Sequence, residues 1–273
     1  MDKNQIFDII EKIKKDTEKD VLKFTLEDES VTIFDSFVYG TPYIPKNGEW
    51  PKDKNGDCLN LLAQINCKEF KNIENFPKEG ILQFFIADDD IYGMDFDNGT
   101  NNDGFRVIYY KDIDYTVTEE DVLKKGSNYA DENNYFPVSK TFKIVFKEPE
   151  KEGISIEDYR FGKMFVDLYN EKSEEKIEAF WDIDDEILEE IYDNENETLI
   201  HKFGGYPSFT QGDPREYGNY ENYDVLLFQL DSDFENGCDK VMWGDAGVSN
   251  FFINENDLKN LNFDNVLYNW DCC

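Results

Sequence analysis

The residues best suited to chemistry lie in the C-terminal third of the chain. His201 is the only histidine among the 273 residues, and an imidazole with an ordinary pKa of about 6.5 can exchange a proton near neutral pH. One histidine cannot supply several imidazole ligands to a metal. A histidine just before the Gly204-Gly205 pair can also anchor that turn by hydrogen bonds, and we favour this structural interpretation over catalysis.

The loops that follow His201 carry amide, basic, aromatic and acidic groups. Binding sites are often built from loops on a rigid scaffold. If these loops form a pocket, its predicted residues are His201, Gln211, Arg215, Trp243 and Asp245. A phosphate loop is not predicted, because Gly204-Gly205-Tyr206-Pro207 lacks the Gly-Lys-Ser/Thr ending that such loops carry. The sequence contains no recognisable set of catalytic residues and indicates no cofactor, so whether the protein is an enzyme is left open.

Three carboxylates alternate at the end of a predicted strand and so fall on one side of it. They belong to Asp231, Asp233 and Glu235. Carboxylate oxygens are suitable ligands for Ca²⁺ or Mg²⁺. The spacing does not fit a calcium loop, since glycine occupies the seventh position and Met242 the twelfth. Acidic clusters arise freely in a chain with 61 Asp and Glu residues, so a divalent-cation site is an alternative rather than the main interpretation.

Two similar sequence units are present. The glycine of a Gly-x-Pro motif stands 24 residues before the glutamine of a Leu-Leu-x-Gln motif in both, from Gly40 to Gln64 and from Gly205 to Gln229. The same order at the same spacing predicts a duplicated unit of about 50 residues. The predicted units cover about residues 37–87 and about residues 201–253.

The two glutamines lie in otherwise apolar predicted strands. A buried side-chain amide must find hydrogen-bond partners. We therefore interpret Gln64 and Gln229 as core residues that tie loops to the sheet. The alternative is that they line a pocket between the two units.

The remaining elements indicate a single α+β domain over residues 1–273. Apolar residues near helical spacing predict an amphipathic helix over residues 2–22. β-branched and aromatic runs bounded by turn residues predict strands, and an acidic segment at about residues 147–198 is predicted to be helical. Strands grouped apart from helices favour a mainly antiparallel sheet, with two pseudo-symmetric β-rich repeats and peripheral helices.

The charge of the chain limits its partners. With 61 acidic residues against 28 Lys and Arg, the formal net charge is −33. Nucleic acids and anionic membranes are bound through clustered Lys and Arg, so we expect neither as a partner. A basic protein would be attracted. The oligomeric state is not predicted.

The N-terminal residues and the cysteines suggest a cytoplasmic location. No run reaches the ~20 apolar residues of a membrane span, and the N-terminal residues form a charged run rather than a signal peptide. The five cysteines are odd in number and irregularly spaced, as expected for reduced thiols. We expect a cytoplasmic protein.

Several phrases of the sequence resemble the YwqG-like family of bacterial proteins, a domain family of unknown function. They include Trp50-Pro51, Gly80-Ile81-Leu82-Gln83-Phe84-Phe85-Ile86, His201-Lys202-Phe203-Gly204-Gly205-Tyr206-Pro207, Trp243-Gly244-Asp245-Ala246-Gly247 and Tyr268-Asn269-Trp270-Asp271-Cys272. The resemblance covers about residues 35–272. It implies a cytosolic bacterial protein without an agreed activity or catalytic set, and makes a toxin-neutralising role conceivable.

The sequence thus favours an acidic binding module that attracts a basic partner protein such as a toxin, since complementary charge accelerates association. One alternative is a small-ligand-binding protein or enzyme with a pocket in the second repeat. The other is a divalent-cation-binding protein.

Overall fold

The computed structural model describes residues 1–71, 73–128, 135–195, 200–235 and 238–273. The strands are β1 (Lys19–Glu27), β2 (Phe37–Val38), β3 (Asn60–Asn66), β4 (Ile81–Ile86), β5 (Phe105–Tyr110), β6 (Phe142–Phe146), β7 (Glu150–Glu152), β8 (His201–Gly204), β9 (Val225–Asp231), β10 (Asp233–Glu235), β11 (Cys238–Val241), β12 (Val248–Ile253) and β13 (Val266–Asp271). The helices are α1 (Lys3–Asp16), α2 (Glu119–Leu123), α3 (Tyr159–Lys172), α4 (Asp185–Glu195) and α5 (Glu255–Lys259), with 3₁₀ turns η1 (Phe180–Asp182) and η2 (Pro214–Glu216).

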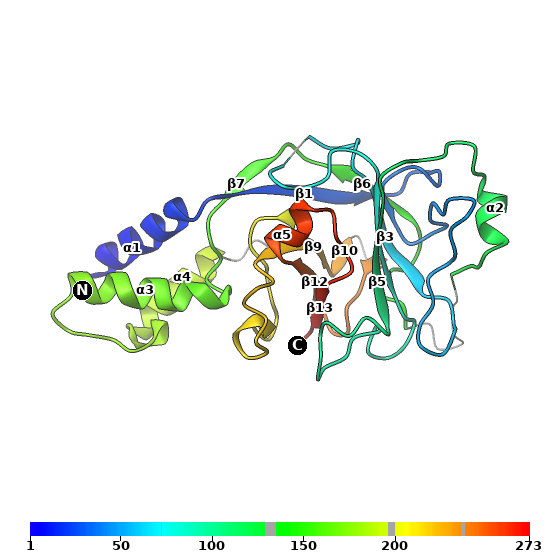
Figure 1. Ribbon diagram of the computed structural model, residues 1–273. Helices are drawn as coiled ribbons and strands as arrows, with labels where there is room; N and C mark the ends of the chain where they lie inside the picture. The colour runs from blue at the N-terminus through cyan, green and yellow to red at the C-terminus, as the bar shows by residue number, and fades with distance from the viewer. Residues whose placement is uncertain (72, 129–134, 196–199, 236–237) are drawn as a thin grey trace.

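Within the described residues, one sheet of 11 strands curls into a nearly closed barrel, with α1, α3 and α4 in a layer at one side (Figure 1). The strand order is β13-β12-β9-β8-β1-β6-β2-β3-β4-β5, and β7 pairs with β1. The pairs of this sheet are antiparallel, as are β10 and β11, which form a separate two-stranded sheet. The predicted α+β class with a mainly antiparallel sheet is confirmed. No helix in the described ranges is long and apolar enough to cross a membrane.

The N-terminal helix is shorter than predicted. α1 begins with a capping box in which Asp2 and Gln5 bond each other's backbone N–H. The predicted range of 2–22 was wrong at its end, because Val21 and Leu22 lie in β1. β1 pairs with β6 on one side and β8 on the other, so strand pairing outweighs the local helical spacing there.

The acidic segment predicted as helical over residues 147–198 contains α3, η1 and α4, but it begins with the short strand β7. The lysine and glutamates of β7 pair with the start of β1, which local sequence could not indicate. The helices have an apolar core of their own, separate from that of the barrel. Its fully buried residues include Ile6, Ile9, Ile13, Phe161, Phe165 and Ile191.

The barrel interior is filled by side chains. β3, β4, β9 and β12 are buried along almost their whole length. Phe84 lies with its ring centroid 4.5 Å from that of Phe228 and 5.0 Å from that of Phe251. Aromatic rings at these separations attract each other beyond the area that they bury. The barrel is therefore a packed core rather than a container for a ligand.

The two glutamines are buried and tie loops to the sheet, as favoured from the sequence. Gln64 Oε1 accepts the backbone N–H of Tyr43 at 2.7 Å. Gln229 Oε1 accepts the backbone N–H of Ser208 at 2.9 Å. Both glutamines are 0% exposed, and each holds the loop that follows its Gly-x-Pro motif.

Candidate functional site

His201 is a buried anchor between two strands. It is the first residue of β8, and its Nδ1 accepts the backbone N–H of Asp231 at 3.1 Å. An accepting Nδ1 carries no proton, so the neutral ring carries its proton on Nε2. The ring is 2% exposed and stacks on Phe24 with a centroid distance of 5.3 Å. The sequence favoured a histidine that anchors the Gly204-Gly205 turn, whereas the hydrogen bond in the structure joins His201 to β9.

The predicted metal ligands are engaged by the protein. Asp231 accepts two backbone N–H groups, those of Ile200 at 3.2 Å and Ser232 at 2.8 Å, and burial raises its pKa. Asp233 Oδ2 lies 3.6 Å from His201 Nε2. Burial acts to raise the pKa of Asp233, but contacts that include His201 outweigh it and hold the pKa below its usual value.

The third predicted ligand, the side chain of Glu235, lies outside the described residues. Among the side chains that the structure describes, no group of three or more His, Cys, Asp or Glu is arranged to hold a metal ion.

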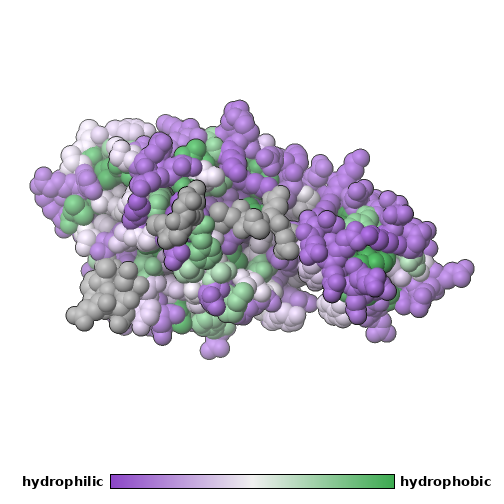
Figure 2. Space-filling view, turned by 180° about the vertical axis from the view of Figure 1, so that it is seen from behind, coloured by the Kyte–Doolittle hydropathy of each residue, from purple (hydrophilic) through white to green (hydrophobic). Residues whose placement is uncertain are grey.

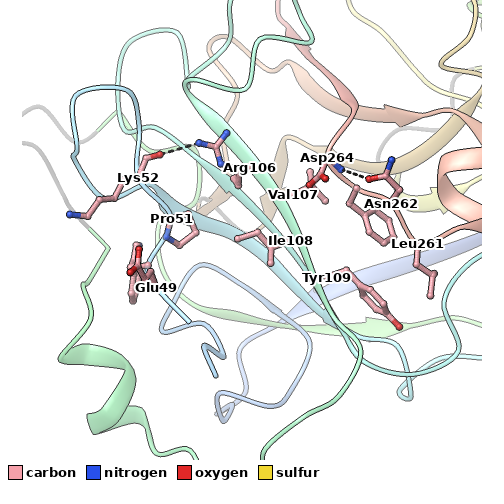
Figure 3. A pocket seen from close by; sticks show the side chains of 12 residues that line it. Glu49, Pro51, Lys52, Arg106, Val107, Ile108, Tyr109, Leu261, Asn262 and Asp264 are labelled. Carbon is pink, nitrogen blue, oxygen red and sulfur yellow. Dashed lines mark hydrogen bonds between the residues drawn. The ribbon is translucent and has the colours of Figure 1, made fainter. Parts of the chain in front are cut away.

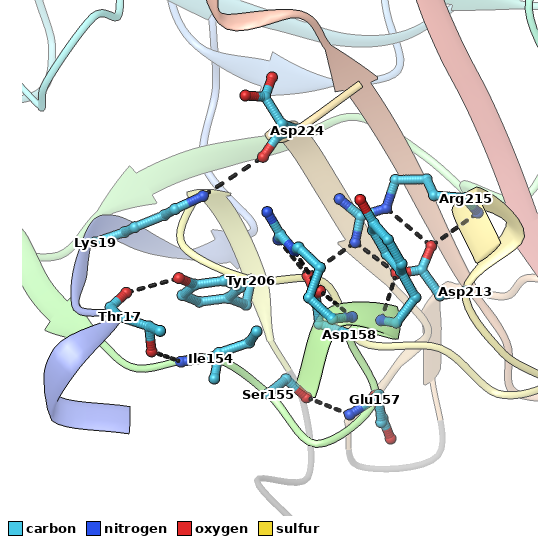
Figure 4. Close-up of polar contacts among 12 residues, drawn as sticks. Thr17, Lys19, Ile154, Ser155, Glu157, Asp158, Tyr206, Asp213, Arg215 and Asp224 are labelled. Atoms are coloured by element: carbon cyan, nitrogen blue, oxygen red, sulfur yellow. Dashed lines mark hydrogen bonds and ion pairs between the residues drawn. The ribbon is translucent and has the colours of Figure 1, made fainter. Parts of the chain in front are cut away.

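Arg215 belongs to a buried charge cluster rather than to an open pocket (Figure 4). It lies on η2 and is 1% exposed. Its guanidinium binds Asp213 through two bonds, from Nε at 2.9 Å and from Nη2 at 2.6 Å. Nη2 also donates to Asp158 Oδ2 at 2.9 Å, and the guanidinium carbon lies 4.4 Å from the centroid of the Phe252 ring. Bidentate pairing and ring stacking leave little of this arginine free for a ligand.

Asp158 connects this cluster to the helical layer. It is the N-cap of α3, accepting the backbone N–H of Arg160 at 3.1 Å. Its carboxylate also accepts two bonds from the guanidinium of Arg160, at 2.7 and 2.6 Å. Burial acts to raise the pKa of Asp158, but Arg160 and Arg215 outweigh it and lower the pKa. The carboxylate therefore stays ionised at neutral pH.

Lys19 lies at the edge of the same cluster. Its Nζ donates to the backbone carbonyl of Asp224 at 3.5 Å and lies 4.8 Å from the centroid of the Tyr206 ring. Burial, and then the positive charge of Arg160, lower the pKa of Lys19. Figure 4 shows its side chain beside Tyr206, whose hydroxyl donates to Thr17 O at 2.7 Å.

Of the other predicted pocket residues, Gln211 and the turn that holds Asp245 both lie against Cys272. Gln211 is exposed and donates from Nε2 to Cys272 O at 2.7 Å. Trp243 is buried and packs edge-on against Tyr92, with a centroid distance of 5.2 Å. Asp245 lies in an exposed turn. The cavities described for this structure are lined by other residues.

A groove of about 490 Å³ lies along β5, at the seam of the barrel. Its base is the strand from Arg106 to Tyr109. One wall is the loop Glu49–Lys52 and the other is the loop Leu261–Asp264, which comes just before β13 (Figure 3). Sequence reasoning missed this groove, because β5 lies beyond the predicted first unit of about residues 37–87 and nothing local in the sequence marks it as a sheet edge.

Polar groups surround the groove. The guanidinium of Arg106 donates to the backbone carbonyls of Asn102 and Lys52, so it is held against the loops. The Tyr109 hydroxyl donates to Glu79 O at 2.7 Å, and burial is the main cause that raises the pKa of Tyr109 to about 12. The carboxylates of Glu49 and Asp264 are exposed on the two walls.

Fold and side chains together define a barrel-like antiparallel β protein with attached helices, in which His201, Arg215 and Trp243 are buried. Residues 36–272 match the family described as a domain of unknown function (DUF1963), and the chain belongs to this family. The match covers nearly the same stretch as the resemblance noted from the sequence. A search of curated proteins found no match to the chain.

Proposed function

We propose that the protein is an acidic binding module whose partner is a basic protein, such as a toxin that it neutralises. The observation that carries the proposal is the acidic surface, defined here as residues 171–195 of the helical layer. It contains 12 acidic residues and 2 lysines. Of these acids, only Glu190 and Glu195 form ion pairs with lysines of α1 among the described residues. The others form no ion pair among the described residues.

Two large aromatic side chains are exposed on the acidic surface. Trp181 is 74% exposed and Tyr192 is 52% exposed. Tryptophan buries much apolar area, and it is enriched among the residues that dominate binding energy at interfaces. It is also the best partner for a cation placed over an aromatic face. An arginine-rich surface would pair with both the ring of Trp181 and its acidic neighbours.

The space-filling view agrees with a separate hydrophilic helical layer. Seen from behind, the part of the molecule formed by the helices is covered mainly by hydrophilic residues (Figure 2). A concentrated negative field steers a basic partner toward this side and raises the association rate at low salt. The Debye length shortens as salt rises, so the proposed association should weaken.

We also infer that the two β-rich units are pseudo-symmetric copies, and this inference supports binding over catalysis. Ser36 Oγ accepts the backbone N–H of Asn66 at 2.8 Å. His201 Nδ1 accepts the backbone N–H of Asp231 at 3.1 Å, at positions that correspond in the aligned units. In the aligned units, His201 thus occupies the position of Ser36. Both side chains accept a backbone hydrogen bond, a role that requires no proton transfer.

Binding of an arginine-rich peptide and of small basic proteins to the full chain tests the proposal. The test variant is Trp181→Ala combined with Glu174→Gln, Glu175→Gln, Asp185→Asn and Glu186→Gln. The matched control removes four exposed charges that are distant in the sequence from the acidic surface. Its substitutions are Asp57→Asn, Asp97→Asn, Asp103→Asn and Asp112→Asn.

We expect the test variant to weaken binding at least about tenfold more than the control, because a central aromatic and its charged neighbours are lost together. Equal weakening by both variants would mean that only overall charge matters, and would refute a defined acidic surface. Binding that is insensitive to salt would refute the charge-based proposal.

A further inference from the structure

β5 is the last strand of the sheet, and half of its backbone groups face away from its neighbour. Ala87 N–H donates to Gly104 O at 2.8 Å, and the register continues without a bulge through β4 and β5. In an antiparallel pair, hydrogen-bonded and non-bonded residues alternate. The backbone groups of Arg106 and Ile108 therefore bond to β4, while those of Val107 and Tyr109 point to the seam.

The strand on the other side of the seam does not use these groups. β13 pairs with β12, and its outer edge meets the loop between β4 and β5. Tyr268 N–H donates to Gly99 O at 2.9 Å, and Trp270 Nε1 donates to Ile91 O at 2.8 Å. Among the described residues, no hydrogen bond crosses from β13 or its preceding loop to the backbone of Val107 or Tyr109. The seam is closed at one end and open along β5.

The open part is a groove of strand-like proportions. Its base of four residues, Arg106 to Tyr109, is about 13 Å long at the usual rise of a strand. On the barrel side its wall includes Leu261 and the Phe263 ring, whose centroid lies 5.4 Å from that of Tyr109. An added strand would lie about 4.8 Å from β5, with alternate side chains facing this apolar wall.

The charges of the rim select the kind of strand. Glu49 and Asp264 lie on opposite walls (Figure 3), both exposed and without an ion pair among the described residues. Lys52 lies on the outer wall with its ammonium group directed away from β5 in Figure 3, and Arg106 is held by backbone carbonyls. A second copy of this chain, with its net charge of −33, would be repelled. A segment carrying lysine or arginine would be attracted.

We propose that β5 is a docking edge for an extended segment of a partner protein, which adds to the sheet as a further antiparallel or parallel strand. The segment carries apolar side chains facing Leu261 and Phe263, and a basic side chain near Glu49 or Asp264. Backbone hydrogen bonds to Val107 and Tyr109 give the affinity, and the groove walls give the specificity. This site is distinct from the acidic surface and does not depend on it.

The free edge is tested first by amide hydrogen exchange of the full chain. The Val107 and Tyr109 amides should exchange roughly a hundredfold or more faster than those of Arg106 and Ile108, which are bonded to β4. Protection of all four amides in the isolated protein would overturn the proposal, since the edge would then already be closed.

The docking step is tested with a displayed library of random seven-residue peptides, selected on the full chain. Selected peptides should alternate apolar and other residues and contain lysine or arginine. Their binding should fall at least about tenfold in Val107→Pro, which removes the outward N–H, but not in Val107→Ala, which keeps it. Proline is tolerated at an edge position whose N–H is not used by the sheet, and thermal melting checks that both variants fold.

A test on the unmodified protein covers the case in which Val107→Pro does not fold. N-methylation of peptide amides that face β5 should abolish binding, while methylation of the amides between them should not. Glu49→Lys combined with Asp264→Lys should weaken the binding of the basic peptides at least about tenfold. The proposal is overturned if no peptide is enriched, or if binding is unaffected by both the proline and the N-methyl groups.

Discussion

Removing Arg215 should destabilise the fold strongly, because the buried carboxylate of Asp213 would lose its arginine partner and that of Asp158 would keep only Arg160. Asp213 and Asp158 have side chains 1% and 0% exposed. Breaking a buried ion pair by removing one partner costs about 3–5 kcal/mol, a large part of the roughly 5–15 kcal/mol that stabilises a typical fold. We expect Arg215→Leu to lower the free energy of unfolding by about 3–5 kcal/mol, and the melting temperature by roughly 6–20 °C.

Two comparisons separate this effect from a general loss of charge. Lys163→Ala removes an exposed ion pair with Asp167 on α3 and should cost no more than about 0.5 kcal/mol. Arg215→Leu combined with Asp213→Leu removes the stranded carboxylate as well, and should recover much of the loss, since apolar replacement of a whole buried pair is often neutral. Urea unfolding at pH 7 measures all three variants.

The pH dependence gives a further check on the same cluster. The pKa of Asp158 is lower in the folded protein than its usual value of about 3.9. Its contribution to stability is therefore present above about pH 4 and is lost as the pH falls through the folded pKa. The difference in the free energy of unfolding between the wild type and Arg215→Leu should therefore decrease in that acid range. A loss of less than about 1 kcal/mol at pH 7 in Arg215→Leu would refute a strongly coupled buried cluster.

Two other predictions concern single residues, the buried His201 and the half-buried Lys19. His201→Asn keeps an acceptor for the Asp231 N–H and His201→Leu removes it, so the leucine variant should be less stable by about 1–3 kcal/mol in urea unfolding; equal stability would show that the hydrogen bond is unimportant. Burial and Arg160 lower the pKa of Lys19 in the folded protein, so its charged form opposes folding. Lys19→Met should have a higher free energy of unfolding than the wild type at pH 7. This advantage should decrease as the pH rises towards the unfolded pKa of lysine, about 10.4. A lower free energy of unfolding of Lys19→Met at pH 7 would contradict the assigned cause.

The sequence predicted features that depend on the local pattern of residues. Gln64 and Gln229 lie at equivalent positions in apolar runs, which predicted buried strands. A side-chain amide buried there has to find hydrogen-bond partners. The strand β1 was missed, because Val21 and Leu22 continue the helical spacing of α1, and only pairing with β6 and β8 identifies them as strand residues. Whether a strand lies at an edge depends on its distant neighbours, so the groove along β5 was beyond local reasoning.

The predicted site residues show a different limit. Histidine, arginine and tryptophan on loops are as suitable for anchoring a fold as for binding a ligand, and the residue types alone do not distinguish the two. Arg215 binds Asp158, which is 57 positions away in the chain. Such long-range pairing decides whether a charge is free, and a single sequence does not contain that information.

The buried cluster also links the fold to the proposed function. The helical layer and the barrel have separate apolar cores, and Tyr206, which follows β8, packs into the core of the helical layer. Asp158 caps α3 and binds Arg215 from the barrel side. The acidic surface includes the last turn of α3 and the residues that follow it, so the orientation of that surface depends on Asp158. A rigid orientation reduces the entropy lost on binding. We therefore expect the buried cluster of Asp158, Asp213 and Arg215 to help hold the proposed acidic surface in one position against the barrel.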